Sequence, residues 1–160
     1  MTIQIGDKLP DATFMVPTAD GPAPKTTADI FAGKKVALFA VPGAYTPTCS
    51  ARHLPSYKDK AAELSAKGVD TIACLSVNDA FVLGAWAKDQ GVSDDIVMLA
   101  DGSGTFAKAI GLEMDASKFG MGMRSQRFSM VADDGVVTHL FVEAPAEYKV
   151  SGAEYMLENM

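Results

Sequence analysis

Apolar residues repeat along this chain with the periods of buried strands and amphipathic helices. Residues 36–41 are all apolar, which is typical of a strand covered on both faces of a sheet. Residues 69–77 (VDTIACLSV) predict a second buried strand. Between them, residues 47–67 predict one helix, and Gly68 follows at a place where helices commonly end in a left-handed residue.

The elements after the second strand continue this alternation. Asp133-Asp134-Gly135 between two alternating runs predicts a hairpin, and residues 17–24, rich in proline and glycine, predict a surface turn between short extended segments. The other predicted elements are helices over 79–90, 104–110 and 151–159, and strands over 96–100, 127–132 and 136–142. The order predicts an α/β, thioredoxin-like fold with a mixed central sheet flanked by helices, in a single domain over residues 1–160.

The composition fits a folded protein and argues against two classes of partner. Hydrophobic residues make up 48% of the 160 positions, and the formal net charge is −6. Because the positive charges are scattered and form no basic stripe, we expect neither nucleic acid nor an anionic membrane as a partner. The first residues lack a targeting pattern, and the longest apolar run, residues 36–42, is too short to span a bilayer. We therefore expect a cytoplasmic protein, with an organellar form that has lost its transit peptide as the alternative.

Cys49, one of two cysteines, stands where a buried strand leads into a helix. Thr46 is a suitable N-cap and Pro47 a suitable first helical residue, so Cys49 would be the third. Unpaired N–H groups and the helix dipole favour the thiolate there, and Arg124 or Arg127 could favour it further. These residues alone leave two interpretations open: a reactive thiol, or a small buried cysteine that happens to begin a helix.

Three residues in this stretch carry a family resemblance. Pro42, Thr46 and Cys49 form the pattern P-x-x-x-T-x-x-C, which resembles the peroxidatic motif of the peroxiredoxins. Residues 42–55 (PGAYTPTCSARHLP) look most like the type II, or peroxiredoxin-five, branch, and the likeness continues through residues 73–82 and 124–137. The resemblance implies a thiol peroxidase that reduces hydroperoxides without a cofactor.

The resemblance also implies roles for four residues. Cys49 would attack the peroxide and become a sulfenic acid, and Thr46 would hydrogen-bond the peroxide and the sulfur. Arg127 would stabilise the thiolate and the leaving oxygen, while Pro42 would wall the pocket against water. Each residue also has a simpler interpretation: Thr46 as an N-cap, Pro42 as a turn residue and Arg127 as a solvated cation. Arg124 is a weaker candidate, which we expect to support a loop or form a salt bridge.

The other cysteine bears on how the sulfenic acid is reduced. Cys74 falls inside a predicted central strand, where a cysteine is usually buried and inert. Some type II members carry a resolving cysteine near the C-terminus, but this chain offers Ser151 there. The resemblance therefore implies an external reductant, glutaredoxin with glutathione or else thioredoxin, and also a homodimer.

Three other functions are conceivable from the sequence. His53 follows Cys49 by four residues and could pair with it for hydrolysis, although we expect it to pack or cap instead. Cys49, Cys74, His53 and His139 could bind zinc, but their spacing matches no structural zinc pattern, so no metal is expected. The same cysteine could also serve a peroxide-sensing protein that is oxidised once and does not turn over.

Overall fold

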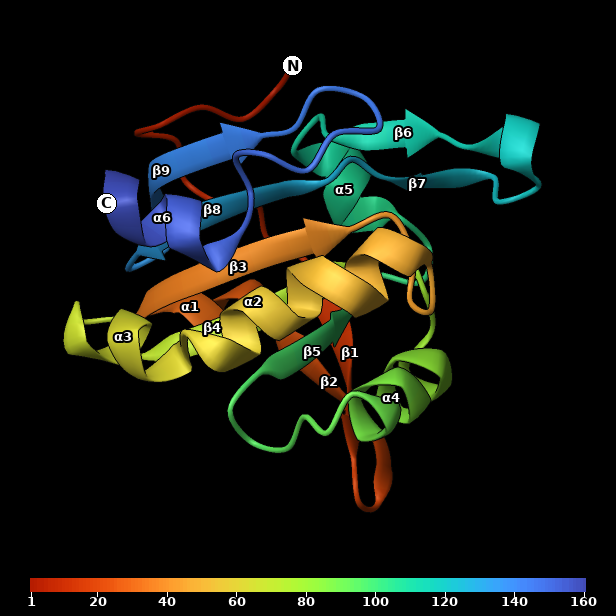
Figure 1. Ribbon diagram of the computed structural model, residues 1–160, viewed down its shortest axis with the longest axis horizontal. Helices are drawn as coiled ribbons and strands as arrows, with labels where there is room; N and C mark the ends of the chain where they lie inside the picture. The colour runs from red at the N-terminus through yellow and green to blue at the C-terminus, as the bar shows by residue number, and fades with distance from the viewer.

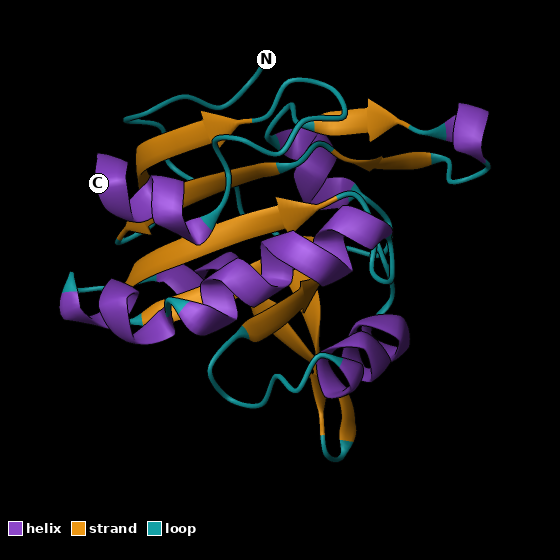
Figure 2. Cartoon of the chain, in the orientation of Figure 1, coloured by secondary structure: helices purple, strands orange, loops and turns teal.

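Seven strands form one mixed sheet at the centre of the protein, which a computed structural model describes over residues 1–160. The strands lie in the order β2-β1-β5-β4-β3-β8-β9. The three central pairings divide by direction: β3, β4 and β5 run parallel, whereas β8 pairs antiparallel with β3. Helices cover both faces of this sheet (Figures 1 and 2). The predicted mixed sheet flanked by helices is confirmed.

The elements follow the chain in an order close to the predicted one. The strands are β1 (Thr13–Thr18), β2 (Gly21–Thr26), β3 (Lys35–Val41), β4 (Thr71–Ser76), β5 (Val97–Ala100), β6 (Glu113–Asp115), β7 (Met123–Ser125), β8 (Phe128–Asp133) and β9 (Val136–Val142). The helices are α1 (Thr27–Phe31), η1 (Cys49–His53), α2 (Leu54–Asp59), α3 (Ala61–Ala66), α4 (Ala80–Asp89), α5 (Thr105–Ala109), η2 (Ser117–Phe119) and α6 (Ala153–Asn159). No helix combines the length and the apolar character needed to cross a membrane.

The core has two layers because β3 is buried on both of its faces. Successive side chains of a strand point to opposite faces, so Phe39 enters one apolar cluster and Leu38 the other. The cluster that holds Phe39 also contains residues of α2, α3, α4 and α6, among them Trp86. The cluster that holds Leu38 contains residues of α1 and α5, including Phe31. This two-sided burial explains the unbroken apolar run of residues 36–41.

Several turns form as the sequence predicts. Gly68 has φ +91° and Val69 N–H donates to the Leu64 carbonyl, so a left-handed residue ends the helix as expected. Asp134 and Gly135 both have positive φ and link β8 to β9 in a two-residue hairpin.

The predicted continuous helix over residues 47–67 is wrong in two places. Residues 49–53 form the π-helical turn η1, in which Leu54 N–H donates to the Cys49 carbonyl, five residues back. Pro55 supplies a reason, since it has no N–H for the Ala51 carbonyl and its ring would clash there in a regular α-helix. A second interruption falls at Lys60, where φ −103° and ψ 10° depart from helical values before α3 begins.

Four short strands and two short helices were not predicted. Residues 17–24, expected to be a turn between extended segments, lie mostly inside the β1–β2 hairpin, whose turn is only Ala19 and Asp20. The glycine-rich residues 119–123 end η2 and begin β7, at the tip of the β6–β7 hairpin. Helix α1 was missed because it spans only five residues, too few to show a period.

Leu64 provides a direct test of this packing, because it is the one buried residue of α3. We expect Leu64→Ala to lower the free energy of unfolding by about 3 kcal/mol, since it leaves a cavity in the core. Ser65→Ala, at an exposed position of the same helix, should change it by less than about 0.5 kcal/mol. Urea denaturation of both variants measures the difference, and equal effects would mean that α3 does not pack as described.

Candidate active site

The pairing of β3 with β8 brings Arg127 to the end of the strand that leads to Cys49. Ala40 of β3 lies opposite Phe128 of β8, so Arg127, one residue earlier, falls beside the carboxyl end of β3. The chain leaves β3 at Val41 and enters η1 at Cys49. Two residues 78 positions apart in the sequence therefore meet at one edge of the sheet.

The Cys49 sulfur accepts a hydrogen bond from the Arg127 guanidinium. The distance from Nη2 to Sγ is 3.2 Å, and the cysteine side chain is fully buried. A guanidinium cannot lose its proton in a protein, so this contact always keeps a positive charge beside the sulfur. This geometry supports a nucleophilic thiol over an inert one.

His53 holds the other side of the same guanidinium. Arg127 Nη1 lies 2.9 Å from His53 Nδ1, and because arginine only donates, Nδ1 must accept. His53 Nε2 lies 3.0 Å from the Ser151 carbonyl, which only accepts, so Nε2 carries the proton. These two contacts fix one neutral tautomer of the ring.

The electrostatics agree with a neutral histidine. Burial, and then the positive charge of Arg127, lower the pKa of His53 from 6.5 to about 3, against the raising effect of the Ser151 carbonyl. The ring packs 5.0 Å from Phe39 and 5.2 Å from Tyr148, which closes it off from water. The hydrolase alternative is therefore wrong, because His53 bonds to Arg127 and Ser151 and has no proton-accepting contact with Cys49.

Of the four predicted site residues, Pro42 and Arg127 line one cavity, whereas Thr46 and Cys49 are not among its lining residues. The cavity is about 550 Å³ in volume, and Thr48 and Phe119 also line it. The Thr46 hydroxyl donates to the Gly43 carbonyl at 2.7 Å, so the predicted capping hydrogen bond from this side chain is not formed. The backbone register is nevertheless the predicted one, since the Thr46 carbonyl accepts from Ser50 N–H.

Arg124 supports the loops around this cavity, as the sequence suggested. Its Nε donates to the Met121 carbonyl at 2.9 Å, and its Nη1 lies 3.4 Å from the Pro42 carbonyl. It thus ties the β6–β7 hairpin to the loop that follows β3. A methyl group at Gly43 would lie 2.9 Å from the Arg124 Nη1 atom, so a larger residue there would displace the guanidinium.

Cys74 is shielded from solvent in the folded protein. It is fully buried in β4, between Phe39 of β3 and Met98 of β5. Burial, with a smaller effect of Cys49, raises the pKa of the Cys74 thiol well above its usual range. A neutral, enclosed thiol is a poor nucleophile.

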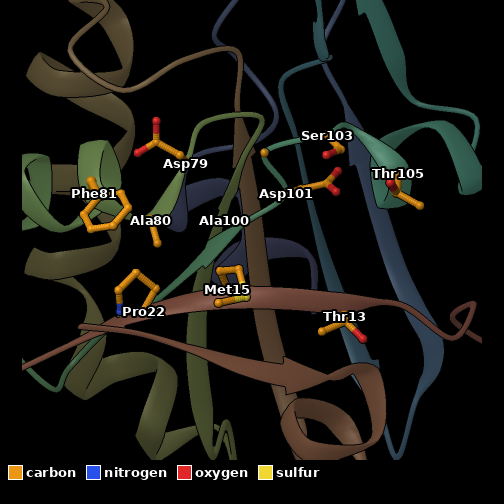
Figure 3. Close-up of a pocket in the computed structure, with 11 residues that line it drawn as sticks. Thr13, Met15, Pro22, Asp79, Ala80, Phe81, Ala100, Asp101, Ser103 and Thr105 are labelled. Atoms are coloured by element: carbon orange, nitrogen blue, oxygen red, sulfur yellow. The ribbon is translucent and has the colours of Figure 1, made fainter. Parts of the chain in front are cut away.

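A second hollow lies away from Cys49, between β1 and the start of α4 (Figure 3). Its volume is about 340 Å³, and Asp79 and Asp101 are among the residues that line it. Both carboxylates are already used: Asp79 accepts from Val82 N–H, and Asp101 accepts from two N–H groups of α5. No three His, Cys, Asp or Glu side chains gather anywhere in the chain to hold a metal ion.

The structure adds residues that motif and period did not identify. His53 was noted only for its spacing from Cys49, whereas its role in holding Arg127 depends on a contact across 74 positions of the sequence. Ser151 provides the carbonyl that fixes the His53 tautomer, and Tyr57 also donates to that carbonyl at 2.8 Å. Tyr148 covers the ring. Only the i,i+4 spacing of Cys49 and His53 gave a signal in the sequence.

Known proteins resemble this chain over nearly its full length. The family model described as Redoxin matches residues 4–157. Peroxiredoxin-2E-2, chloroplastic, from Oryza sativa subsp. japonica is 52% identical over 98% of this chain and 72% of its own length. Peroxiredoxin-2E, chloroplastic, from Arabidopsis thaliana is 48% identical over 98% of this chain and 69% of its own. The crystal structure of reduced Prx3 in complex with hydrogen peroxide, from Vibrio vulnificus, superposes with a TM-score of 0.94 at 54% identity, covering 98% of both chains.

We expect the neutral state of His53 to make the protein less stable as the pH falls. The unfolded chain takes up a proton at this ring below about pH 6.5, whereas the folded protein does so only near pH 3. Unfolding therefore binds a proton in this window, and stability present above pH 6.5 is lost as the pH is lowered. Below about pH 6.5 the free energy of unfolding falls by about 1.4 kcal/mol for each pH unit. Lowering the pH from 7 to 5 should therefore reduce the free energy of unfolding by about 2 kcal/mol through this group.

Urea denaturation at the two pH values measures this loss. His53→Gln should abolish most of it, while His139→Gln, a change of the only other histidine, should retain it. An undiminished pH dependence in His53→Gln would show that the folded protein binds the proton as readily as the unfolded chain.

Proposed function

Because this chain belongs to the peroxiredoxin family of thiol peroxidases, we propose that Cys49 is the thiol through which it reduces hydroperoxides. The family predicted from the sequence is confirmed by the match to the Redoxin model and by relatives of about 50% identity. The protein is an enzyme that consumes peroxide with electrons from a thiol. The observation that carries the assignment to Cys49 is the hydrogen bond from the Arg127 guanidinium to its sulfur.

The proposed reaction takes place at the sulfur. The Cys49 thiolate attacks the terminal oxygen of the hydroperoxide, an S–O bond forms and the O–O bond breaks. The leaving oxygen takes a proton and departs as water or an alcohol, and cysteine becomes a sulfenic acid. In this proposal the guanidinium of Arg127, which contacts the sulfur, stabilises negative charge first on the sulfur and then on the leaving oxygen.

Thr46 and Pro42 have roles in this proposal that follow from their donors and acceptors. The Thr46 O–H donates a hydrogen bond to the Gly43 carbonyl, which leaves the hydroxyl oxygen free to accept a hydrogen bond from the O–H of a peroxide. Pro42 has no N–H and lines the cavity together with Arg127, so in this proposal it limits the contact of water with the site. The Vibrio vulnificus relative, described as a complex with hydrogen peroxide, supports a peroxide site of this kind.

We infer that an external thiol reduces the sulfenic acid. Cys74 is enclosed and protonated, and Ser151 stands where some type II members have a resolving cysteine. A small thiol or a redoxin would attack the Cys49 sulfur, form a mixed disulfide and release water, and a second thiol would restore the cysteine.

We propose glutaredoxin with glutathione as the reductant, with thioredoxin as the alternative. A cytoplasmic location stays a prediction.

A peroxidase assay with each reducing system tests this function. Cys49→Ser should lower the turnover rate by at least about a hundredfold, because the nucleophile is lost. Cys74→Ser should keep turnover within about twofold, because that thiol takes no part. Full activity in Cys49→Ser would contradict the central assignment.

Loss of recycling in Cys74→Ser, with a single normal reaction with peroxide, would contradict external-only reduction. A wild-type protein that is oxidised once by peroxide and never turns over with any reductant would instead be a sensor.

We also propose that the protein forms a homodimer through one side of the molecule. The loop after β3, α4 and the β6–β7 hairpin lie on one side of the molecule, at the right of Figure 1. These elements carry exposed apolar side chains, of which Tyr45, Phe81 and Phe119 are 51%, 75% and 76% exposed. Phe119 lines the cavity beside Arg127 and Phe81 lines the second hollow, and exposed apolar groups on one side of a molecule are typical of a surface that a partner covers.

Sedimentation analysis tests the dimer. We expect the wild type to sediment at twice the chain mass of 16.8 kDa and Phe81→Asp to shift toward the monomer, because a charge would be buried in the contact. Ile5→Asp is the matched control, since Ile5 is 65% exposed on the N-terminal segment at the top of Figure 1. A monomeric wild type, or equal shifts in both variants, would contradict the proposed surface.

A further inference from the structure

Glu143 carries a buried carboxylate that the proposed reaction does not use. It follows β9 directly and is only 7% exposed. No lysine or arginine forms a salt bridge with it. Instead it accepts hydrogen bonds of 2.6 to 2.9 Å from the N–H groups of Lys149, Val150 and Ser151 and from the Ser151 hydroxyl. Although burial raises its pKa, these bonds outweigh burial and leave the pKa below its ordinary value.

These bonds form part of a closed ring that includes the guanidinium on the sulfur. Glu143 N–H donates to the Arg127 carbonyl at 3.0 Å. The Glu143 carboxylate holds Ser151, the Ser151 carbonyl accepts from His53 Nε2, and His53 Nδ1 accepts from Arg127 Nη1. The remaining Arg127 Nη2 contacts Cys49 Sγ. Arg127 is thus held at its backbone and at its guanidinium by the same carboxylate-anchored ring.

We propose that Glu143 is a positioning residue for the chemistry of Cys49, acting through Ser151 and His53 on the Arg127 guanidinium. This inference rests on the proposed function of Cys49. Residues 149–151 form no regular element, so the carboxylate is what fixes their N–H groups and thereby the direction of the Ser151 carbonyl. If that carbonyl moves, His53 loses the contact that sets its tautomer, and the Nδ1 acceptor for Arg127 is no longer assured.

The proposal predicts a change at the sulfur when Glu143 changes. In Glu143→Gln an amide N–H₂ would face backbone N–H groups, so part of the anchor must break. A misplacement of about 1 Å at a reacting group can cost about a hundredfold in rate. We expect the rate constant for Cys49 with hydrogen peroxide to fall by at least about tenfold, and the pH midpoint of Cys49 alkylation by iodoacetamide to rise.

Glu154→Gln is the matched control, because it removes the same charge three residues after Ser151. Glu154 is exposed and makes no hydrogen bond or salt bridge in the structure. We expect it to change the rate by less than about twofold and to leave the pH midpoint in place. Equal effects in the two variants would mean that charge, and not positioning, is responsible, and would overturn the proposal.

A second measurement reports on the ring independently of peroxide turnover. ¹⁵N NMR of the ring nitrogens of His53 should show a single neutral tautomer with the proton on Nε2 in the wild type and in Glu154→Gln, and a mixture of tautomers in Glu143→Gln. An unchanged tautomer in Glu143→Gln would overturn the proposal even if activity falls. Failure of the Cys49 assignment would appear separately, as full activity in Cys49→Ser.

Ser151→Ala keeps the proposal testable if Glu143→Gln does not fold. It removes only the 2.6 Å contact of the hydroxyl and leaves the N–H bonds of the loop to the carboxylate. We expect the same changes as in Glu143→Gln, but smaller. The rate constant of Cys49 with hydrogen peroxide should fall by about threefold, and the pH midpoint of alkylation should rise. Wild-type values of both would overturn the proposal.

Discussion

The contact between the Arg127 guanidinium and the Cys49 sulfur depends on a histidine that stays uncharged. His53 accepts a hydrogen bond from Arg127 at 2.9 Å, and a protonated ring would instead place two cations side by side. Burial, to which Phe39 and Tyr148 contribute, and then the charge of Arg127 lower the pKa of His53 to about 3 and so keep the ring neutral near pH 7. Apolar packing therefore determines the electrostatics of the reactive thiol.

The fold supplies this arrangement with few elements. The antiparallel pairing of β3 with β8 brings Arg127 to the carboxyl end of β3, where η1 begins with Cys49. The π-helical turn then spans Cys49 to His53, so both partners of the guanidinium come from one turn of helix. The loop after β9 completes the enclosure, because its Ser151 carbonyl sets the tautomer of His53 and its Tyr148 covers the ring.

Local patterns in the sequence predict the framework of this site but not its connections. The apolar run at 36–41, the glycine after α3 and the Asp-Gly turn are short-range signals, and each gave the right element. The π-turn was missed although Pro55 was visible, because one missing donor can break, kink or widen a helix and only packing selects among these. The contacts of His53 with Arg127 and Ser151 link positions 74 and 98 residues apart, which no period or spacing encodes.

Mass spectrometry of the reduced protein after one equivalent of hydrogen peroxide tests the central claim most directly. Two cysteines and nine methionines compete for the oxidant, so the site of oxidation is informative. The account predicts one added oxygen on the peptide that contains Cys49, trapped by a sulfenic acid reagent, with Cys74 unmodified. Oxidation spread over the methionines, or found first at Cys74, would contradict it.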